Sequence, residues 1–283
     1  MVYNKAKRGV ESMNRTVTEY FKSVGVDYFA ALSYADCREI NTPLRERMGF
    51  EPRTAIIFLL PYYAGETVNL SRYAASLDYH LAIREITDGL ITALKAEYPE
   101  GSFAGYGDHS PIDEVGAALA AGLGVIGDNG LIINEEYGSY VFVADLLTDL
   151  SPELFSARKP MPTKHCERCG ACKRACPTGI LSGEGADCLS AITQRKGELA
   201  EWEISLMRKE QTVWGCDVCQ SVCPHNKSPK MTPIAFFHRE RIPKLTLEIL
   251  EGMPRVEFSR RAFAWRGRKT VERNLRLLYP DSK

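Results

Sequence analysis

One stretch decides how this chain is organised: Cys166-Glu-Arg-Cys169-Gly-Ala-Cys172-Lys-Arg-Ala-Cys176-Pro177. Its four cysteines follow the spacing C-x2-C-x2-C-x3-C-P. Thiolates gathered over so short a span can converge on one small centre. The stretch therefore indicates a segment that is organised by metal rather than by apolar burial.

This is the cysteine spacing with which bacterial ferredoxins ligate [4Fe–4S] clusters. A tight loop lets the first three thiolates reach three irons of one cubane, while the fourth is carried to a neighbouring cluster. Pro177 then helps to turn the chain away. The alternative is a pair of structural zinc sites, which is disfavoured because zinc knuckles rarely show this spacing.

A second run, Cys216-Asp-Val-Cys219-Gln-Ser-Val-Cys223-Pro224, keeps the C-x2-C pair and the distal Cys-Pro but lacks one middle cysteine. The two runs supply seven of the eight thiolates that two cubanes need, and Cys188 can supply the eighth. The crossed ligation rule then predicts two ligand sets, namely Cys166, Cys169, Cys172 and Cys223, and Cys176, Cys188, Cys216 and Cys219. The ninth cysteine, Cys37, is expected to be a small buried hydrophobe.

The composition is that of an ordinary globular protein, with 45% hydrophobic and 25% charged residues. Lys+Arg and Asp+Glu both number 36, so any binding to nucleic acid or membrane has to be local. The most apolar run, Ala55–Tyr63, is too short to span a bilayer, and the N-terminus lacks the apolar core of a signal peptide. We therefore expect a cytoplasmic protein without membrane contact, where cysteines serve metal more often than disulfides.

Hydrophobic periodicity predicts alternating helices and strands through about residue 150. The expected helices are 11–24, Arg72–Leu94 and Pro111–Ala121, the last with proline in its first turn. The expected strands are Asp27–Ser33 and Thr54–Pro61, followed by a hairpin over Gly130–Leu146 that turns at Glu135–Gly138. This alternation is typical of an α/β domain. The predicted division is an α/β domain over 1–155, a two-cluster ferredoxin-like domain over 156–230, and a short basic helical tail over 231–283.

Beyond the cysteines, the chain resembles the epoxyqueuosine reductases, which use cobalamin and two [4Fe–4S] clusters to deoxygenate a modified tRNA base. The resemblance rests on several blocks in the same order, namely Leu70–Ala74, Asp78–His80, Asp108–Pro111, Ala121–Gly127, Asn134–Ser139, Cys188–Ser190, Gly215–Gln220 and Arg273–Leu275. Several matched blocks are far more specific than any one of them.

The resemblance implies a nitroreductase-like α/β domain that binds base-off cobalamin, as in reductive dehalogenases. It implies cofactor contacts from Tyr73, His80, Gly124, Ile126, Tyr137 and Ser139. It also implies that Asp108, three positions before Pro111, is the catalytic acid that protonates the departing oxygen. From the residues alone, Asp108 is equally well explained as a residue at the start of the helix expected at Pro111.

His80 stands in Asp78-Tyr79-His80-Leu81-Ala82-Ile83, which lacks the glycine of the D-x-H-x-x-G signature of cobalt-ligating histidines. We therefore expect His80 to pack near the cofactor without ligating cobalt. Three positions depart from the family pattern. Val115 follows Glu114 where the family has a basic residue, and Val125 and Asp128 replace a tryptophan and a basic residue.

The sequence and the resemblance also predict binding partners. Residues 255–276 combine eight Lys or Arg with two Glu and three aromatic residues, which suits tRNA binding and equally suits a solvated amphipathic helix. The resemblance implies a reduced flavodoxin or ferredoxin-type electron donor, and we expect a monomer. Two alternatives remain, a corrinoid iron–sulfur reductase of another small electrophile and a non-catalytic [4Fe–4S] electron carrier.

Overall fold

The computed structural model describes residues 14–155, 165–185 and 187–280. These residues form two compact units, each built from separated stretches of the chain. The first unit contains residues 14–60, 83–125 and 142–155, and the second contains residues 61–82, 126–141 and 165–280 without residue 186. This division differs from the three contiguous domains expected from the sequence. Among the described helices, none is long and apolar enough to cross a membrane.

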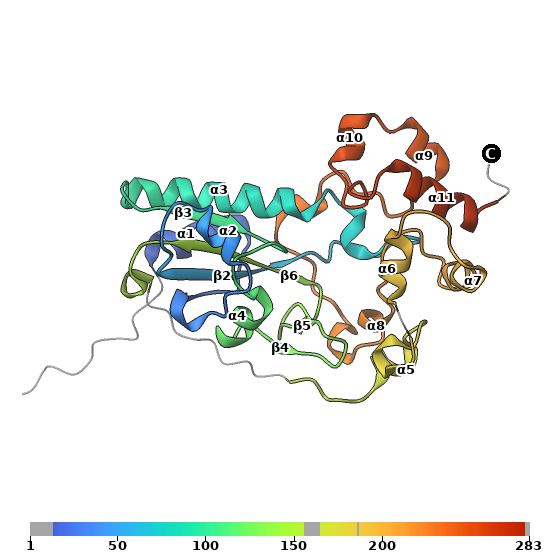
Figure 1. Ribbon diagram of the computed structural model, residues 1–283, viewed down its shortest axis with the longest axis horizontal. Coiled ribbons are helices and arrows are strands. Elements are labelled where there is room, and N and C mark those ends of the chain that lie inside the picture. Colours follow the sequence, from blue (N-terminus) through green and yellow to red (C-terminus); the bar gives the residue numbers. More distant parts are fainter. Residues whose placement is uncertain (1–13, 156–164, 186, 281–283) are drawn as a thin grey trace, which may run out of the picture. The chain divides into compact units, whose positions relative to one another are not determined.

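The first unit is an α/β structure, as the sequence predicted, and it is built around a four-stranded sheet of order β1-β2-β6-β3 (Figure 1). The strands are β1 (Phe29–Ser33), β2 (Thr54–Pro61), β3 (Phe103–Tyr106) and β6 (Val141–Thr148). β1 pairs antiparallel with β2, and β3 pairs antiparallel with β6, which places Tyr106 opposite Asp145. Every residue of β2 is buried, as expected for a nearly continuous apolar run in the middle of a sheet.

Helices cover both faces of this sheet, with α3 (Tyr79–Glu97) on one side and α4 (Glu114–Ala120) on the other (Figure 1). α1 (Arg15–Val24) begins where the Asn14 side chain accepts the backbone N–H of Val17, and it ends at Gly25 in the left-handed conformation. The short segments are α2 (Thr42–Glu46), η1 (Tyr34–Asp36) and η3 (Pro152–Phe155). The expected start of α1 at residues 11–13 lies outside the described residues.

The long helix expected over Arg72–Leu94 is interrupted. A 3₁₀ turn, η2 (Arg72–Ala75), is followed by an extended stretch, and α3 begins only at Tyr79. The reason is a pairing that periodicity does not reveal. Leu77 forms a β-bridge with Arg261, and the backbone N–H of Asp78 donates to the carbonyl of Arg260 at 2.8 Å.

The hairpin expected over Gly130–Leu146 is also wrong, because its two strands do not pair with each other, although the turn between them is present. Asn134 and Gly138 pair with each other across the turn. The flanking strands take other partners, because β5 (Ile132–Ile133) pairs with β4 (Val125–Ile126) and β6 joins the large sheet. Tertiary partners outweighed the local hairpin signal.

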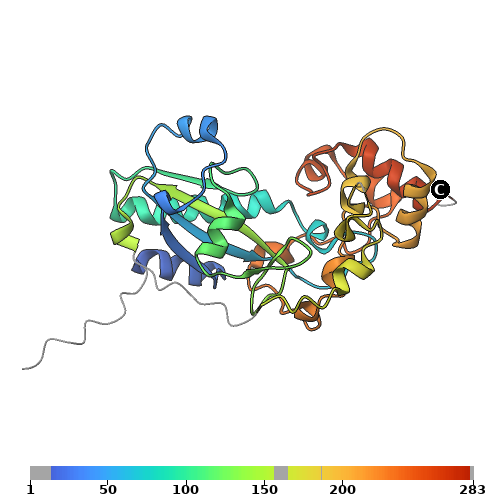
Figure 2. The same ribbon diagram turned by 60° about the horizontal axis from the view of Figure 1, so that its bottom comes forward.

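The second unit is mainly helical, with a core around the fully buried Trp214. Its helices and 3₁₀ turns are α5 (Ala171–Ala175), η4 (Ile180–Ser182), α6 (Leu189–Gln194), α7 (Glu201–Lys209), α8 (Val218–Ser221), η5 (Pro224–Asn226), η6 (Ala235–His238), α9 (Leu247–Gly252), α10 (Arg255–Ser259) and α11 (Arg268–Leu278). Figures 1 and 2 show α7, α9, α10 and α11 gathered together.

The segment expected to be a basic tail is therefore part of a packed core. Phe258, Phe263 and Leu275 belong to the same buried cluster as Leu189 and Trp214. Asn274 on α11 is completely buried, and its side-chain amide donates to the carbonyls of Thr193 at 2.7 Å and Val213 at 2.8 Å. This asparagine joins α11 to the part of the chain that carries the cysteines.

Substituting Asn274→Ala should lower the free energy of unfolding of the second unit by about 2–4 kcal/mol, because two buried carbonyls lose their donor. Urea denaturation followed by circular dichroism measures the effect. Lys269→Ala, an exposed change on the same helix, is the control and should shift the midpoint very little. Equal midpoints for the two variants would contradict this account of Asn274.

Candidate functional site

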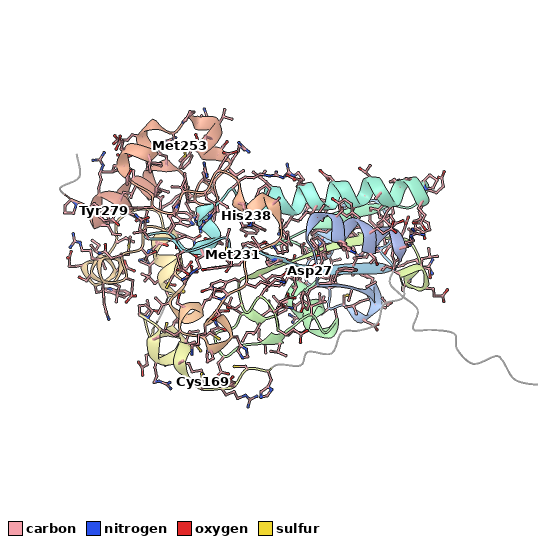
Figure 3. All side chains as sticks on the ribbon, turned by 180° about the vertical axis from the view of Figure 1, so that it is seen from behind. Asp27, Cys169, Met231, His238, Met253 and Tyr279 are labelled. Atoms are coloured by element: carbon pink, nitrogen blue, oxygen red, sulfur yellow. The ribbon has the colours of Figure 1, made fainter. Side chains whose placement is uncertain are left out.

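Four of the predicted ligands line one pocket in the second unit. Cys166, Cys169, Cys172 and Cys223 surround it, together with the segment Gly127–Asn129. Of these four, Cys166 and Cys169 precede α5 and Cys172 lies within it, while Cys223 stands just before η5. Cys169 is exposed and lies at the edge of the molecule in Figure 3. The structure thus brings together the four cysteines that the crossed rule assigned to one cluster.

Three ligands of the second set also lie near one another. The thiolates of Cys188 and Cys219 act electrostatically on Cys216, and Cys188 acts likewise on Cys219. Burial raises the pKa of Cys216 to about 12 and that of Cys219 to about 11. Such thiols ionise readily only beside a cation, and iron bound there would supply the missing positive charge.

Cys176, the fourth member of that set, has a different environment. Burial alone would raise the pKa of its thiol, but interactions with the backbone N–H groups of Leu181, Thr178 and Gly179 and with the Thr178 hydroxyl lower it. Donors aimed at a sulfur stabilise a thiolate and are common around cluster ligands. The donor sets therefore fit iron–sulfur clusters.

A carboxylate fixes the loop that carries Cys216 and Cys219. Asp217 accepts the Ser71 hydroxyl at 2.6 Å and the backbone N–H of Arg72 at 2.6 Å. Its side chain is only 9% exposed, and the Arg72 guanidinium lies 3.3 Å away.

In the first unit, the predicted acid Asp108 lies on an exposed bend between β3 and α4. Its φ angle is 63°, an unusual left-handed conformation for a residue other than glycine. The cap of α4 is Asp113, whose side chain accepts the backbone N–H of Gly116, so the helix begins later than predicted. The explanation of Asp108 as a helix cap is therefore wrong.

Two carboxyl groups that the sequence analysis did not select lie near this bend. Burial, together with the charges of Asp145 and Asp108, raises the pKa of Glu114 to about 9. Burial also raises the pKa of Asp145 to about 7. A carboxylate in the middle of the apolar strand β6 was the only sequence signal for Asp145. Both groups hold protons far more readily than ordinary carboxyls.

The comparisons with known proteins agree with this arrangement. Residues 165–226 match the family described as 4Fe-4S double cluster binding domain. The epoxyqueuosine reductase of Listeria monocytogenes is 34% identical over 72% of this chain and 55% of its own length, and that of Lactococcus garvieae is 32% identical over 73% and 60%. The chain is a relative of the epoxyqueuosine reductases. It spans a little over half the length of these two curated relatives.

Solved epoxyqueuosine reductases share the fold. One selenomethionine-labelled crystal structure has a TM-score of 0.74 and 25% identity, covering 93% of this chain and 80% of the other. The enzyme from Bacillus subtilis, with its catalytic aspartate loop swung out of the active site, has a TM-score of 0.73 and 26% identity over the same shares. Another, at 0.72 and 25% identity over the same shares, holds an epoxyqueuosine-modified tRNA stem loop.

Two of the residues that the epoxyqueuosine reductase resemblance assigned to the cofactor are engaged by protein. Ser139 is buried, donating to Gln220 at 3.0 Å and accepting from Asn226 at 2.8 Å. Tyr137 is 1% exposed, with the Lys230 ammonium 5.1 Å from its ring centre. Gly138 between them has φ +61°, and a side chain there would collide with Asn226. These positions shape the turn, so their direct contact with a cofactor stays a prediction.

The other four predicted cofactor residues differ in exposure. Tyr73 is half-buried and accepts the Trp214 indole N–H at 3.1 Å, and Gly124 is buried. His80 is exposed, pairs with Asp78 at 2.8 Å and stacks on Tyr79. Ile126 is 46% exposed. His80 and Ile126 are exposed enough to contact a large planar cofactor, so the predicted set fits such a cofactor in part.

The cations of residues 255–276 are mostly used within the second unit. Arg261 and Arg276 form ion pairs with Glu257 and Glu272, and Arg268 and Arg273 donate to backbone carbonyls. Arg260 pairs with Glu240 at 3.2 Å. The local charge counted from the sequence is therefore largely neutralised by neighbours or used to hold the chain.

Cys188→Ala should reduce the iron content of the anaerobically reconstituted protein from about eight to about four atoms per chain, because one cubane loses a ligand. Iron and sulfide analysis measures this. Cys37→Ala is the matched control and should retain the full content, since burial raises the pKa of that thiol to about 12 and no predicted ligand lies beside it in the chain. Full iron retention in the Cys188 variant would remove it from the ligand set.

Proposed function

We propose that this chain reduces epoxyqueuosine to queuosine in tRNA. One observation carries the proposal. The aspartate that the family motif identifies as the acid, Asp108, stands on an exposed, left-handed bend beside two proton-holding carboxyls. The similarity to enzymes of that activity, one of them solved with an epoxyqueuosine-modified tRNA stem loop, supports it.

The reaction removes an epoxide oxygen as water and therefore consumes two electrons and two protons. In this proposal the eight cysteines hold two clusters that deliver the electrons one at a time. Asp108 gives a proton to the oxygen as its bond to carbon breaks, which prevents an unfavourable alkoxide from forming. The electron donor is proposed to be a reduced flavodoxin or ferredoxin-type protein.

Cobalamin is the second proposed cofactor, with its lower base displaced. When bound, it would supply a strongly reducing cobalt centre close to the epoxide carbon. His80 pairs with Asp78 and stacks on Tyr79, which favours a packing role over cobalt ligation. Exposed Ile126 offers an apolar contact to the macrocycle. Titration of the cluster-loaded protein with cobalamin, followed by absorbance, tests this binding.

A second candidate function keeps these cofactors but reduces another small electrophile. The observation that favours it is Asp128, which carries a negative charge where the family has a basic residue. Asp128 borders the pocket of the first four cysteines and lies 3.7 Å from Lys173. Comparing turnover on epoxyqueuosine-containing tRNA with turnover on the free nucleoside and on simple epoxides separates the two candidates.

Asp108→Asn should keep both clusters but lower turnover ~10²–10⁴-fold, the usual contribution of a positioned general acid. Asparagine preserves size and hydrogen bonding but delivers no proton. The measurement is queuosine formation on modified tRNA, with iron content determined on the same sample. Asp113→Asn is the matched control, since it alters the cap of the next helix and leaves Asp108 unchanged. Turnover within a few-fold of wild type in the Asp108 variant would refute the assignment.

A tRNA contact is proposed at Trp265, which is 59% exposed, with the Arg266 guanidinium 3.7 Å from its ring centre. Trp265→Ala should weaken binding of a tRNA stem loop about 5- to 100-fold, because stacking of one base contributes ~1–3 kcal/mol. Fluorescence anisotropy at fixed salt measures it. Trp202→Ala, which removes another exposed tryptophan of the second unit, is the control. Equal losses in both variants would point to a nonspecific effect and contradict this contact.

A further inference from the structure

Two of the eight predicted cluster ligands, all of which lie in described residues, are exposed at the surface of the second unit. They are Cys169 and Cys188, and the crossed rule assigns one of them to each cluster. The other six are intermediate in exposure. A partner protein comes closest to a cluster where one of its ligands reaches the surface. These two cysteines are therefore the candidate entry points for an electron from outside.

The two exposed cysteines lie in stretches of opposite charge. Residues 165–177, around Cys169, contain three Lys or Arg and one Glu, which gives a net charge of +2. Residues 178–188, which end at Cys188, contain two carboxylates and no Lys or Arg, which gives −2. Arg195 pairs with Asp187 at 3.4 Å, but it also pairs with Glu203, so it does not reverse the charge near Cys188.

The cations of the first stretch lie beside Cys169. Arg168 precedes it directly and is exposed. Arg174 is also exposed, and its Nη1 donates to the carbonyl of Cys169 at 3.0 Å. Lys173, exposed as well, lies 3.7 Å from Asp128, which borders the pocket of the first four cysteines. Cations still outnumber carboxylates when Asp128 is counted. We call the three cations together with Cys169 the Cys169 surface.

This surface suits a protein partner that carries acidic residues around its own redox centre. Electron-transfer complexes are small and short-lived, and complementary charge brings their partners together quickly. An acidic partner is attracted to the Cys169 surface and repelled near Cys188, so charge selects one of the two entry points. Nucleic acid fits this surface less well, because residues 165–177 contain no Phe, Tyr or Trp on which a base could stack.

We propose that the Cys169 surface is the docking site of the electron donor, and that this donor is a small one-electron carrier protein whose redox centre is ringed by carboxylates. The inference rests on the proposed function only in taking the chain to accept electrons from a protein. In each encounter one electron leaves the donor's centre and is taken up at the cluster predicted for Cys169, which passes from its 2+ to its 1+ state. No bond breaks and no proton moves.

Zero-length cross-linking locates the docking site without any turnover. The cluster-loaded full chain is mixed with an oxidised acidic [2Fe–2S] ferredoxin, treated with a carbodiimide and mapped by mass spectrometry. Ferredoxin carboxylates should couple to Lys173. The yield should fall about 3- to 30-fold in Arg168→Glu, which keeps Lys173 but opposes docking. Lys209→Glu, an exposed change on α7 of the same unit, is the matched control and should leave that yield unchanged. Coupling confined to other lysines, or equal yields in Arg168→Glu and wild type, overturns the proposal.

Stopped-flow reduction supplies a second measurement. Reduced ferredoxin is mixed with the oxidised chain at low ionic strength, and bleaching of the clusters is followed by absorbance. Arg168→Glu should slow the second-order step about 3- to 30-fold, and high salt should remove the difference because ions screen the charges. Glu184→Lys, an exposed change near Cys188, should alter the rate less than about twofold.

The opposite pattern would contradict the proposal. If Glu184→Lys accelerates reduction and Arg168→Glu leaves it unchanged, the donor docks near Cys188. Iron content is determined on every sample, because Arg168 stands between predicted ligands. If Arg168→Glu loses iron, Lys173→Glu, judged by the same reduction rates, decides in its place.

Turnover separates this inference from the proposed function. If the chain couples through Lys173 and is reduced as expected but forms no queuosine on modified tRNA, the proposed function fails and the docking site stands. If a chemical reductant supports queuosine formation while coupling avoids Lys173, the docking site fails alone. Weaker binding of a tRNA stem loop by Arg168→Glu, with ferredoxin coupling unchanged, would assign the surface to nucleic acid and also overturn the proposal.

Discussion

The hydrogen bonds received by Asp217 fix the loop of the second unit that carries two predicted cluster ligands. This carboxylate lies between two predicted cluster ligands, Cys216 and Cys219, and accepts from both Ser71 and the backbone of Arg72. It is 9% exposed, so each bond is made in a medium where charge-assisted hydrogen bonds are strong. These bonds therefore order the loop that carries Cys216 and Cys219 against the segment of Ser71 and Arg72.

The acidic residues of the first unit differ from one another in exposure. Asp108 is exposed on its bend, whereas Glu114 is partly buried and Asp145 is completely buried. Burial raises the pKa of both of these carboxyls, and the charge of Asp145 contributes to raising that of Glu114. The proposed acid and the two carboxyls with raised pKa lie within one short segment and its neighbouring strand.

The sequence predicted features that depend on local chemistry and missed those that depend on distant partners. The cysteine spacing grouped four predicted ligands that line one pocket in the structure, since the spacing of cluster ligands follows from their geometry. The strands Thr54–Pro61 and Phe29–Ser33 were visible from their apolar runs. By contrast, the break before Tyr79 is caused by pairing with Arg260 and Arg261. Asp145 could not be assigned because its environment comes from another strand, a helix and a loop.

The interleaving of the two units has a consequence for synthesis. The chain passes from the first unit to the second after Leu60, returns at Ile83, leaves again after Val125 and returns at Phe142. Leu70 and Ala74 share a core with Val271 and Leu275, about two hundred residues later in the chain. During synthesis the apolar side chains of these early segments therefore stay uncovered until α11 has emerged from the ribosome. Such long-range contacts form slowly, and they make the nascent chain dependent on protection from aggregation until α11 is made.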